Sequence, residues 1–89
     1  MNRQDRILQA ARMSMAADDR LWLDRQLDTI ERRIREVAAM APGTRFADME
    51  LRAVAMIASS VYEKTRAVQW FDDVCAELRA HAARLEGRS

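Results

Sequence analysis

The chain has few residues that interrupt helices. Its 89 residues include two glycines and one proline, and no proline follows Gly43. Between Thr44 and Glu86 there is therefore no glycine or proline at which a helix has to stop. Aromatic residues make up only 6% of the chain, and β-branched residues are thinly spread, so a packed β-sheet is not expected. We predict an all-α fold in a single domain of residues 1–89.

The chain also lacks the residue patterns that enzymatic and metal sites need. Its one cysteine, Cys75, excludes an internal disulfide, and its one histidine, His81, has no sequence-near partner for a metal site or a catalytic triad. No glycine-rich phosphate loop and no nucleophile-elbow motif occurs. We therefore predict no catalytic residues, no cofactor and no bound metal, and hence a protein that is not an enzyme.

Charge and hydropathy argue against nucleic acid and membranes as partners. The formal net charge is +1, from 15 basic and 14 acidic residues that alternate along the chain. A charge this small gives no overall attraction to phosphate. No apolar run is long enough to span a membrane, and the first residues resemble an amphipathic segment rather than a signal peptide. We expect a cytoplasmic protein without a membrane partner.

The first half of the chain carries a strong helical pattern. Its apolar residues recur at alternating spacings of four and three, at Leu23, Leu27, Ile30, Ile34, Val37 and Ala41. This heptad spacing is typical of antiparallel helical hairpins and bundles. A weaker amphipathic segment precedes it, and Asp18 or Asp19 can cap a new helix. The first arm, residues 3–41, is therefore predicted to be one helix or two helices that meet near Asp18.

One turn divides the chain into two halves. Pro42 cannot continue a helix, Gly43 can adopt the left-handed conformation at a helix end, and Thr44 or Asp48 can cap the next helix. We place the turn at 42–47.

The second arm is predicted to be one unbroken helix over 48–86. The two arms then have equal lengths, each about 58 Å at 1.5 Å per residue. Folding about Gly43 predicts an antiparallel hairpin in which Ile34 lies near Val54 and Leu27 lies near Val61.

The second arm has two apolar stripes, and only one of them can face the first arm. The other stripe reads Met49, Ala53, Met56, Ser60, Ala67, Trp70 and Val74. A two-helix hairpin has no layer that covers these residues, so we expect a second copy or another protein to bury them. A homodimer would form a four-helix-type bundle.

These patterns lead to a functional hypothesis of protein binding. We predict a non-enzymatic adaptor or inhibitor that docks onto and occludes or scaffolds another protein. Its contact surface is expected to comprise Trp22, Met49, Met56, Trp70 and Val74, since Met offers adaptable contacts and Trp can anchor an interface. An alternative is a structural or chaperone subunit that holds an amphipathic helix of a client in the same groove.

A second alternative is a regulator that binds DNA or RNA through the hairpin tip. The basic residues near the tip are Arg32, Arg33, Arg45 and Arg52. They are interleaved with acidic residues, which weakens attraction to phosphate. We therefore expect protein rather than nucleic acid as the partner.

Overall fold

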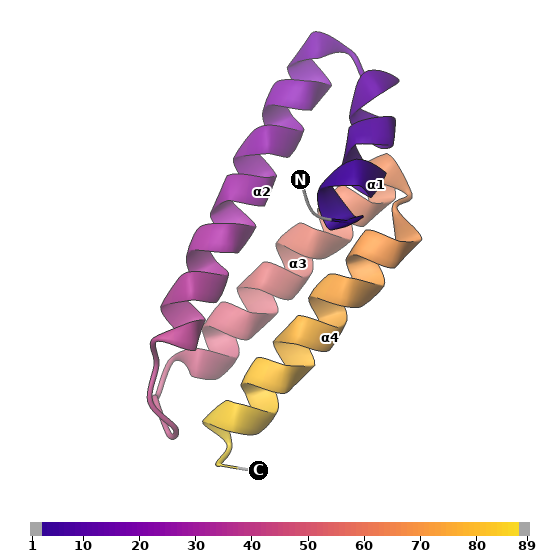
Figure 1. Ribbon diagram of the computed structural model, residues 1–89. Helices are drawn as coiled ribbons and strands as arrows, with labels where there is room; N and C mark the ends of the chain where they lie inside the picture. Colours follow the sequence, from indigo (N-terminus) through magenta and orange to yellow (C-terminus); the bar gives the residue numbers. More distant parts are fainter. Residues whose placement is uncertain (1–2, 88–89) are drawn as a thin grey trace.

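The chain folds into four α-helices, α1 (Arg3–Met13), α2 (Ala17–Ala38), α3 (Ala47–Thr65) and α4 (Val68–Leu85) (Figure 1). The structure is a computed structural model that describes residues 3–87, with side chains from Leu8 onward. No strand occurs in this range, so the prediction of an all-α fold is confirmed. None of the described helices combines the length and the hydropathy that a membrane span requires.

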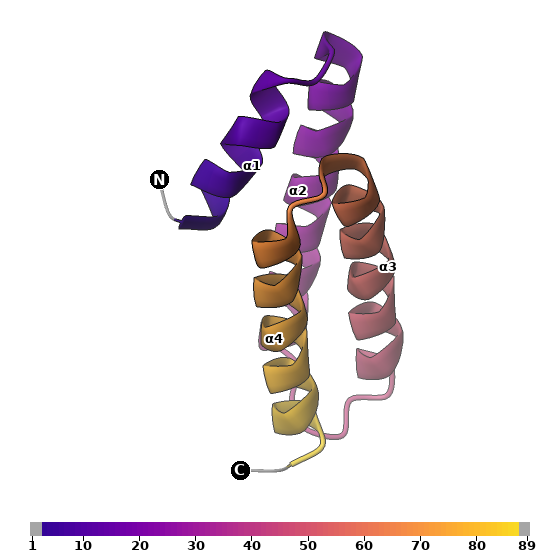
Figure 2. The ribbon, with the colours of Figure 1, turned by 90° about the vertical axis from the view of Figure 1, so that its right-hand side faces the viewer.

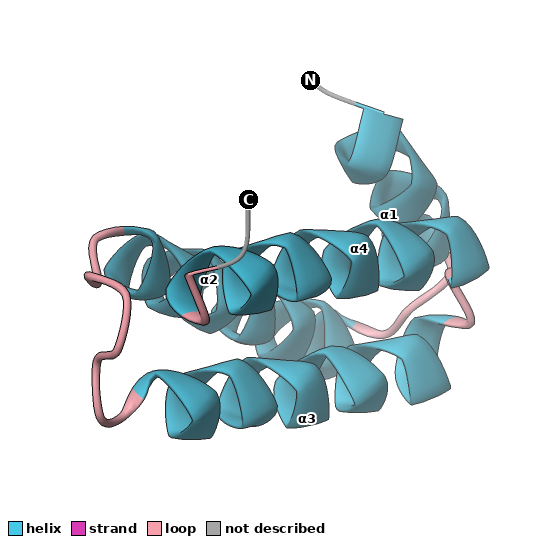
Figure 3. Ribbon diagram, turned by 90° about the horizontal axis from the view of Figure 1, so that it is seen from below, coloured by secondary structure: helices cyan, strands magenta, loops and turns pink. Residues whose placement is uncertain are grey.

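Three of the helices run side by side in alternating directions. α3 packs against both α2 and α4, which also contact each other, and α1 packs mainly on α4 and α3 (Figures 1 and 3). Figure 2 shows α1 leaning away from the lower part of α2 and over the start of α4. The described molecule measures 42 × 21 × 21 Å. A hairpin with two straight arms would be longer, so each predicted arm is folded once more.

The first arm is broken between Met13 and Ala17. The Ser14 hydroxyl donates to the carbonyl of Ala11 at 2.9 Å, and the N-cap of α2 is Ala16, which makes no side-chain cap bond. The predicted capping role of Asp18 or Asp19 is therefore wrong. Both carboxylates instead lie in the first turn of α2, where the helix dipole favours negative charge.

The second arm is broken at Arg66, so the prediction of one unbroken helix over 48–86 is wrong. Arg66 has a φ of 57°, in the left-handed region, and its N–H donates to the carbonyl of Tyr62 at 2.6 Å. The Thr65 hydroxyl donates to the Val61 carbonyl at 2.8 Å and accepts the N–H of Ala67 at 3.2 Å. Side-chain and backbone bonds thus end α3 without a glycine or a proline.

The positions of the apolar residues explain why the chain reverses at this point. Ala58 on α3 and Leu78 on α4 are both core residues. On one continuous helix with about 100° of rotation per residue, they would point roughly 160° apart. A straight helix would then have to bury its two halves on opposite sides. Reversal at Arg66 turns both faces toward one shared core.

Two ion pairs show the register between α2 and α3. Arg33 pairs with Glu50 at 3.1 Å, and Asp19 pairs with Lys64 at 3.3 Å. The two positions on each helix are two heptads apart, as an antiparallel pair with a constant register requires. This register places Ile30 at the level of Val54, and the predicted pairing of Ile34 with Val54 is wrong by about one helical turn.

The cause of the register error lies in the connection between α2 and α3. α2 ends at Ala38 rather than Ala41, and the connection runs over residues 39–46 instead of the predicted 42–47. The Thr44 hydroxyl donates back to the Ala41 carbonyl, and the N-cap of α3 is Phe46, without a side-chain cap bond. The predicted capping by Thr44 or Asp48 is therefore also wrong.

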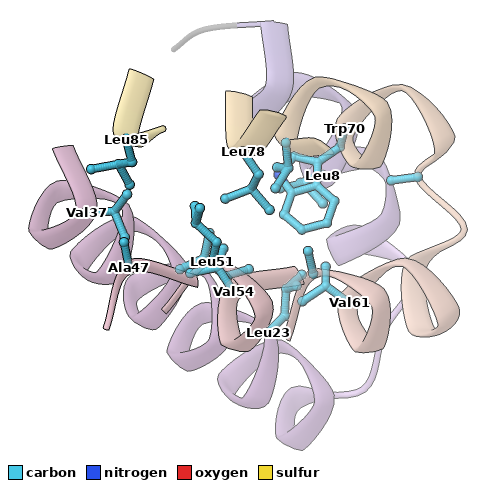
Figure 4. Close-up of a cluster of buried hydrophobic side chains, with 14 residues drawn as sticks. Leu8, Leu23, Val37, Ala47, Leu51, Val54, Val61, Trp70, Leu78 and Leu85 are labelled. Carbon is cyan, nitrogen blue, oxygen red and sulfur yellow. The ribbon is translucent and has the colours of Figure 1, made fainter. Parts of the chain in front are cut away.

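One apolar cluster holds the four helices together (Figure 4). Its largest fully buried side chains are Leu23, Val37, Val54 and Val61. In the close-up, Leu23 lies beside Val61, Val37 beside Ala47, and Leu8 of α1 beside Trp70 of α4.

The C-terminal end of α4 is attached to the hairpin tip by polar contacts. Arg84 donates from Nη1 to the carbonyl of Met40 at 2.9 Å and from Nη2 to that of Val37 at 2.8 Å. The N–H of Gly43 donates to the Leu85 carbonyl at 3.1 Å. A helix leaves its last carbonyls without intrahelical partners. Arg84 supplies donors to this end of α2, at the pole where the dipole favours a cation.

The left-handed residue at the α3–α4 connection gives a first prediction. We expect Arg66→Gly to stabilise the fold by about 0.5–1 kcal/mol, because glycine adopts a positive φ without the steric penalty of a Cβ. The measurement is the free energy of unfolding from urea denaturation followed by circular dichroism. The control is Arg66→Ala, which removes the same charge but keeps the Cβ. If Gly and Ala variants were equally stable, backbone strain at Arg66 would not be the cause.

Candidate functional site

The structure separates the residues of the predicted contact surface. Trp70 and Val74 are each only 3% exposed and belong to the core. The prediction that they form an exposed stripe with Met49 and Met56 was therefore wrong, because the stripe assumed an unbroken second helix. Trp22 on α2 is partly buried and packs against the same core.

Met49 and Met56 do lie at the surface. Their exposed fractions are 66% and 72%. Phe46, directly before α3, is 57% exposed. Residues spaced by three and four continue this line along one side of α3. We define the α3 face as Phe46, Met49, Ala53, Met56 and Ser60.

The α3 face points away from the rest of the molecule. The buried residues of α3 lie on the opposite side of the helix, at Ala47, Leu51, Val54, Ala58 and Val61. α2 and α4 pack on α3 from the core side. The helix thus has a buried apolar inner side and, on its outer side, the exposed side chains of Met49 and Met56. Within the described chain nothing covers the outer side.

Charged side chains border the α3 face. Arg52 and Glu63 are exposed, and neither makes an ion pair or a side-chain hydrogen bond with the described residues. The guanidinium of Arg45 lies over the Phe46 ring, 5.7 Å from its centroid, in cation–π geometry. The face therefore has an apolar centre with a charged border.

Phe46 was missed by the sequence analysis because it precedes the predicted helix. A usable signal was present, since Phe46 lies three residues before Met49 and continues the spacing of the stripe. Arg84 was missed for another reason. Its carbonyl partners lie more than 40 residues earlier in the chain, and no local pattern connects such distant groups.

The four arginines of the nucleic-acid alternative are not equivalent. Arg33 donates to both carboxylate oxygens of Glu50, at 3.3 and 3.1 Å, and is partly buried. Arg45 lies over Phe46, whereas Arg32 and Arg52 are exposed. Two of the four cations are thus already in contact with groups of this chain.

The described residues include no candidate metal centre. No group of three His, Cys, Asp or Glu side chains among residues 8–87 is arranged to hold a metal ion. His81 lies 3.9 Å from Glu77 on the next turn of α4, and Cys75 is a free, partly buried thiol.

Comparison with known proteins adds no family. No protein-family model, curated protein or solved structure matches this chain. The α3 face therefore has to be interpreted from its own geometry and chemistry.

Proposed function

We propose that this chain is a non-enzymatic protein-binding module, a small adaptor or inhibitor that docks onto another protein through the α3 face. The observation that supports this most is the exposure of Met49 and Met56 on a helix whose opposite side is buried. Methionine side chains adapt to differently shaped partners, and the nearby Phe46 adds a rigid aromatic contact. A single-helix face is small, so we expect a weak or transient contact.

The shape of the face favours docking over client holding. The α3 face is the outer side of one helix, and α2 and α4 lie behind it. A groove for a client helix would need walls on both sides. We therefore favour a module that inserts α3 into a partner over a chaperone that encloses a client.

Binding of nucleic acid through the tip arginines has less support. Arg33 and Arg45 are engaged with Glu50 and Phe46, and acidic side chains alternate with all four arginines. A phosphate-binding surface gains affinity from several free cations acting together. The proposed protein contact is instead expected to persist at moderate salt.

The test compares charge insertion on and off the α3 face. We expect Met56→Lys to lower capture of the protein's partner from host extract at least tenfold, because it places an ammonium in a contact that must lose water. Ala76→Lys adds the same charge at an exposed position of α4 and is expected to leave capture unchanged. Captured proteins are identified by mass spectrometry, and both variants are checked by circular dichroism. Equal capture by wild type and Met56→Lys would contradict the proposed role of the face.

A further inference from the structure

The border of the α3 face carries two opposite charges that can pair with the same two charges of a second copy. Arg52 and Glu63 carry opposite charges, and neither has a partner within the described chain. They are eleven residues apart, which places them roughly 20° apart around the helix and about 16 Å apart along it. Both charges therefore lie on the same side of the face, one near each end of its C-terminal half.

A two-fold axis would bring these charges together. When two copies of one helix pack antiparallel around a perpendicular two-fold axis, each border of one copy meets the same border of the other. With the axis midway between Arg52 and Glu63, Arg52 of each copy faces Glu63 of the second copy. One symmetric contact then forms two ion pairs without any rearrangement of the helix.

The C-terminal half of the α3 face suits the same arrangement, whereas Phe46 and Met49 lie beyond the end of the second copy's α3. In this register Met56 of each copy lies against Ser59 and Ser60 of the second copy. Small side chains at these positions allow the helix axes to approach, and the flexible Met side chain fills the remaining space. α2 and α4 pack on the core side of α3, so they do not obstruct the approach.

We propose that the C-terminal half of the α3 face, at Ala53, Met56 and Ser60, docks antiparallel onto the same half of a second copy, with Arg52 of each copy paired to Glu63 of the other. This inference rests on the proposed function insofar as it uses the same face as a docking surface, and it names the occupant as the chain itself. The buried area of one helix pair is small, so the dimer is weak, with a dissociation constant on the order of tens of micromolar. A different protein that binds this face competes with self-association.

Charge reversal tests the pairing directly. Arg52→Glu places two carboxylates together in the homodimer, and Glu63→Arg places two cations together. Each variant alone is expected to self-associate at least tenfold more weakly than wild type. An equal mixture of the two variants restores both ion pairs, so it is expected to form a heterodimer of wild-type affinity. The chain that carries both substitutions is likewise expected to regain homodimerisation.

Sedimentation equilibrium measures these affinities, and circular dichroism checks that each variant is folded. The control is Arg25→Glu, the same charge reversal at an exposed position of α2, which is expected to leave dimerisation unchanged. A wild-type protein that stays monomeric at roughly ten times the expected dissociation constant overturns the proposal. The proposal is also overturned if the single charge reversals leave the dissociation constant unchanged, or if the mixture of the two variants fails to associate.

The outcome separates this inference from the proposed function. If the wild type is monomeric while capture of a host protein still depends on Met56, the self-pairing is wrong and the docking function stands. If the charge-swapped mixture dimerises while capture is insensitive to Met56→Lys, the self-pairing stands and docking onto another protein through this face is wrong.

Discussion

Replacing Trp70 with alanine is expected to destabilise the protein by about 3–5 kcal/mol. The side chain is 3% exposed and lies in the core cluster, where it contributes to the contact between α4 and Leu8 of α1. Its removal deletes buried apolar surface and leaves a cavity that the neighbouring helices fill only in part. Because the free energy of unfolding of small domains is only about 5–15 kcal/mol, this loss is a large share of the total stability.

The measurement is urea unfolding followed by circular dichroism, with Met56→Ala as the control. Met56 is largely exposed, so its truncation is expected to change the unfolding free energy by less than about 0.5 kcal/mol. The two variants thus distinguish a core residue from a surface residue of the same predicted stripe. An unchanged stability of Trp70→Ala would mean that Trp70 is not packed as the structure has it.

Replacing Arg84 with methionine is expected to destabilise the protein by about 1.5–3 kcal/mol. Arg84 makes two charge-assisted hydrogen bonds, to the carbonyls of Val37 and Met40, and bonds of this kind contribute more than neutral ones. Methionine retains most of the aliphatic stem, so the change reports on the lost donors. The Met40 carbonyl would then depend on water for a hydrogen bond, and the Val37 carbonyl would keep only the N–H of Met40, at 3.0 Å.

The control for this variant is Arg79→Met on the same helix. Arg79 is exposed and makes no ion pair with the described residues. We expect its substitution to change the unfolding free energy by less than about 0.5 kcal/mol. Hydrogen exchange of the last turn of α2 provides a second readout, which should speed up in Arg84→Met and stay unchanged in Arg79→Met. Similar stabilities of the two variants would contradict a stabilising role for the hydrogen bonds of Arg84.

The candidate site was predictable in part. Met49 and Met56 stand out in the sequence as apolar residues outside the seam that pairs the two arms, and the structure leaves both exposed. Trp70 and Val74 follow the same spacing, yet they are buried. The spacing alone could not separate the two pairs, because it assumes that the helix continues through Arg66.

The sequence by itself determined that the chain is helical, where its apolar seam lies, and that it turns after α2. These features depend on local preferences and on a 3.6-residue period, both of which are present in the order of the residues. Two further features were decided by the tertiary structure, namely the reversal at Arg66 and the register of α3 against α2. At Arg66 the left-handed residue has an unfavourable local energy, which the burial of Ala58, Val74 and Leu78 in one core outweighs. A non-local gain of that kind has no signature in any short stretch of the chain, and it determines which half of the predicted stripe remains at the surface.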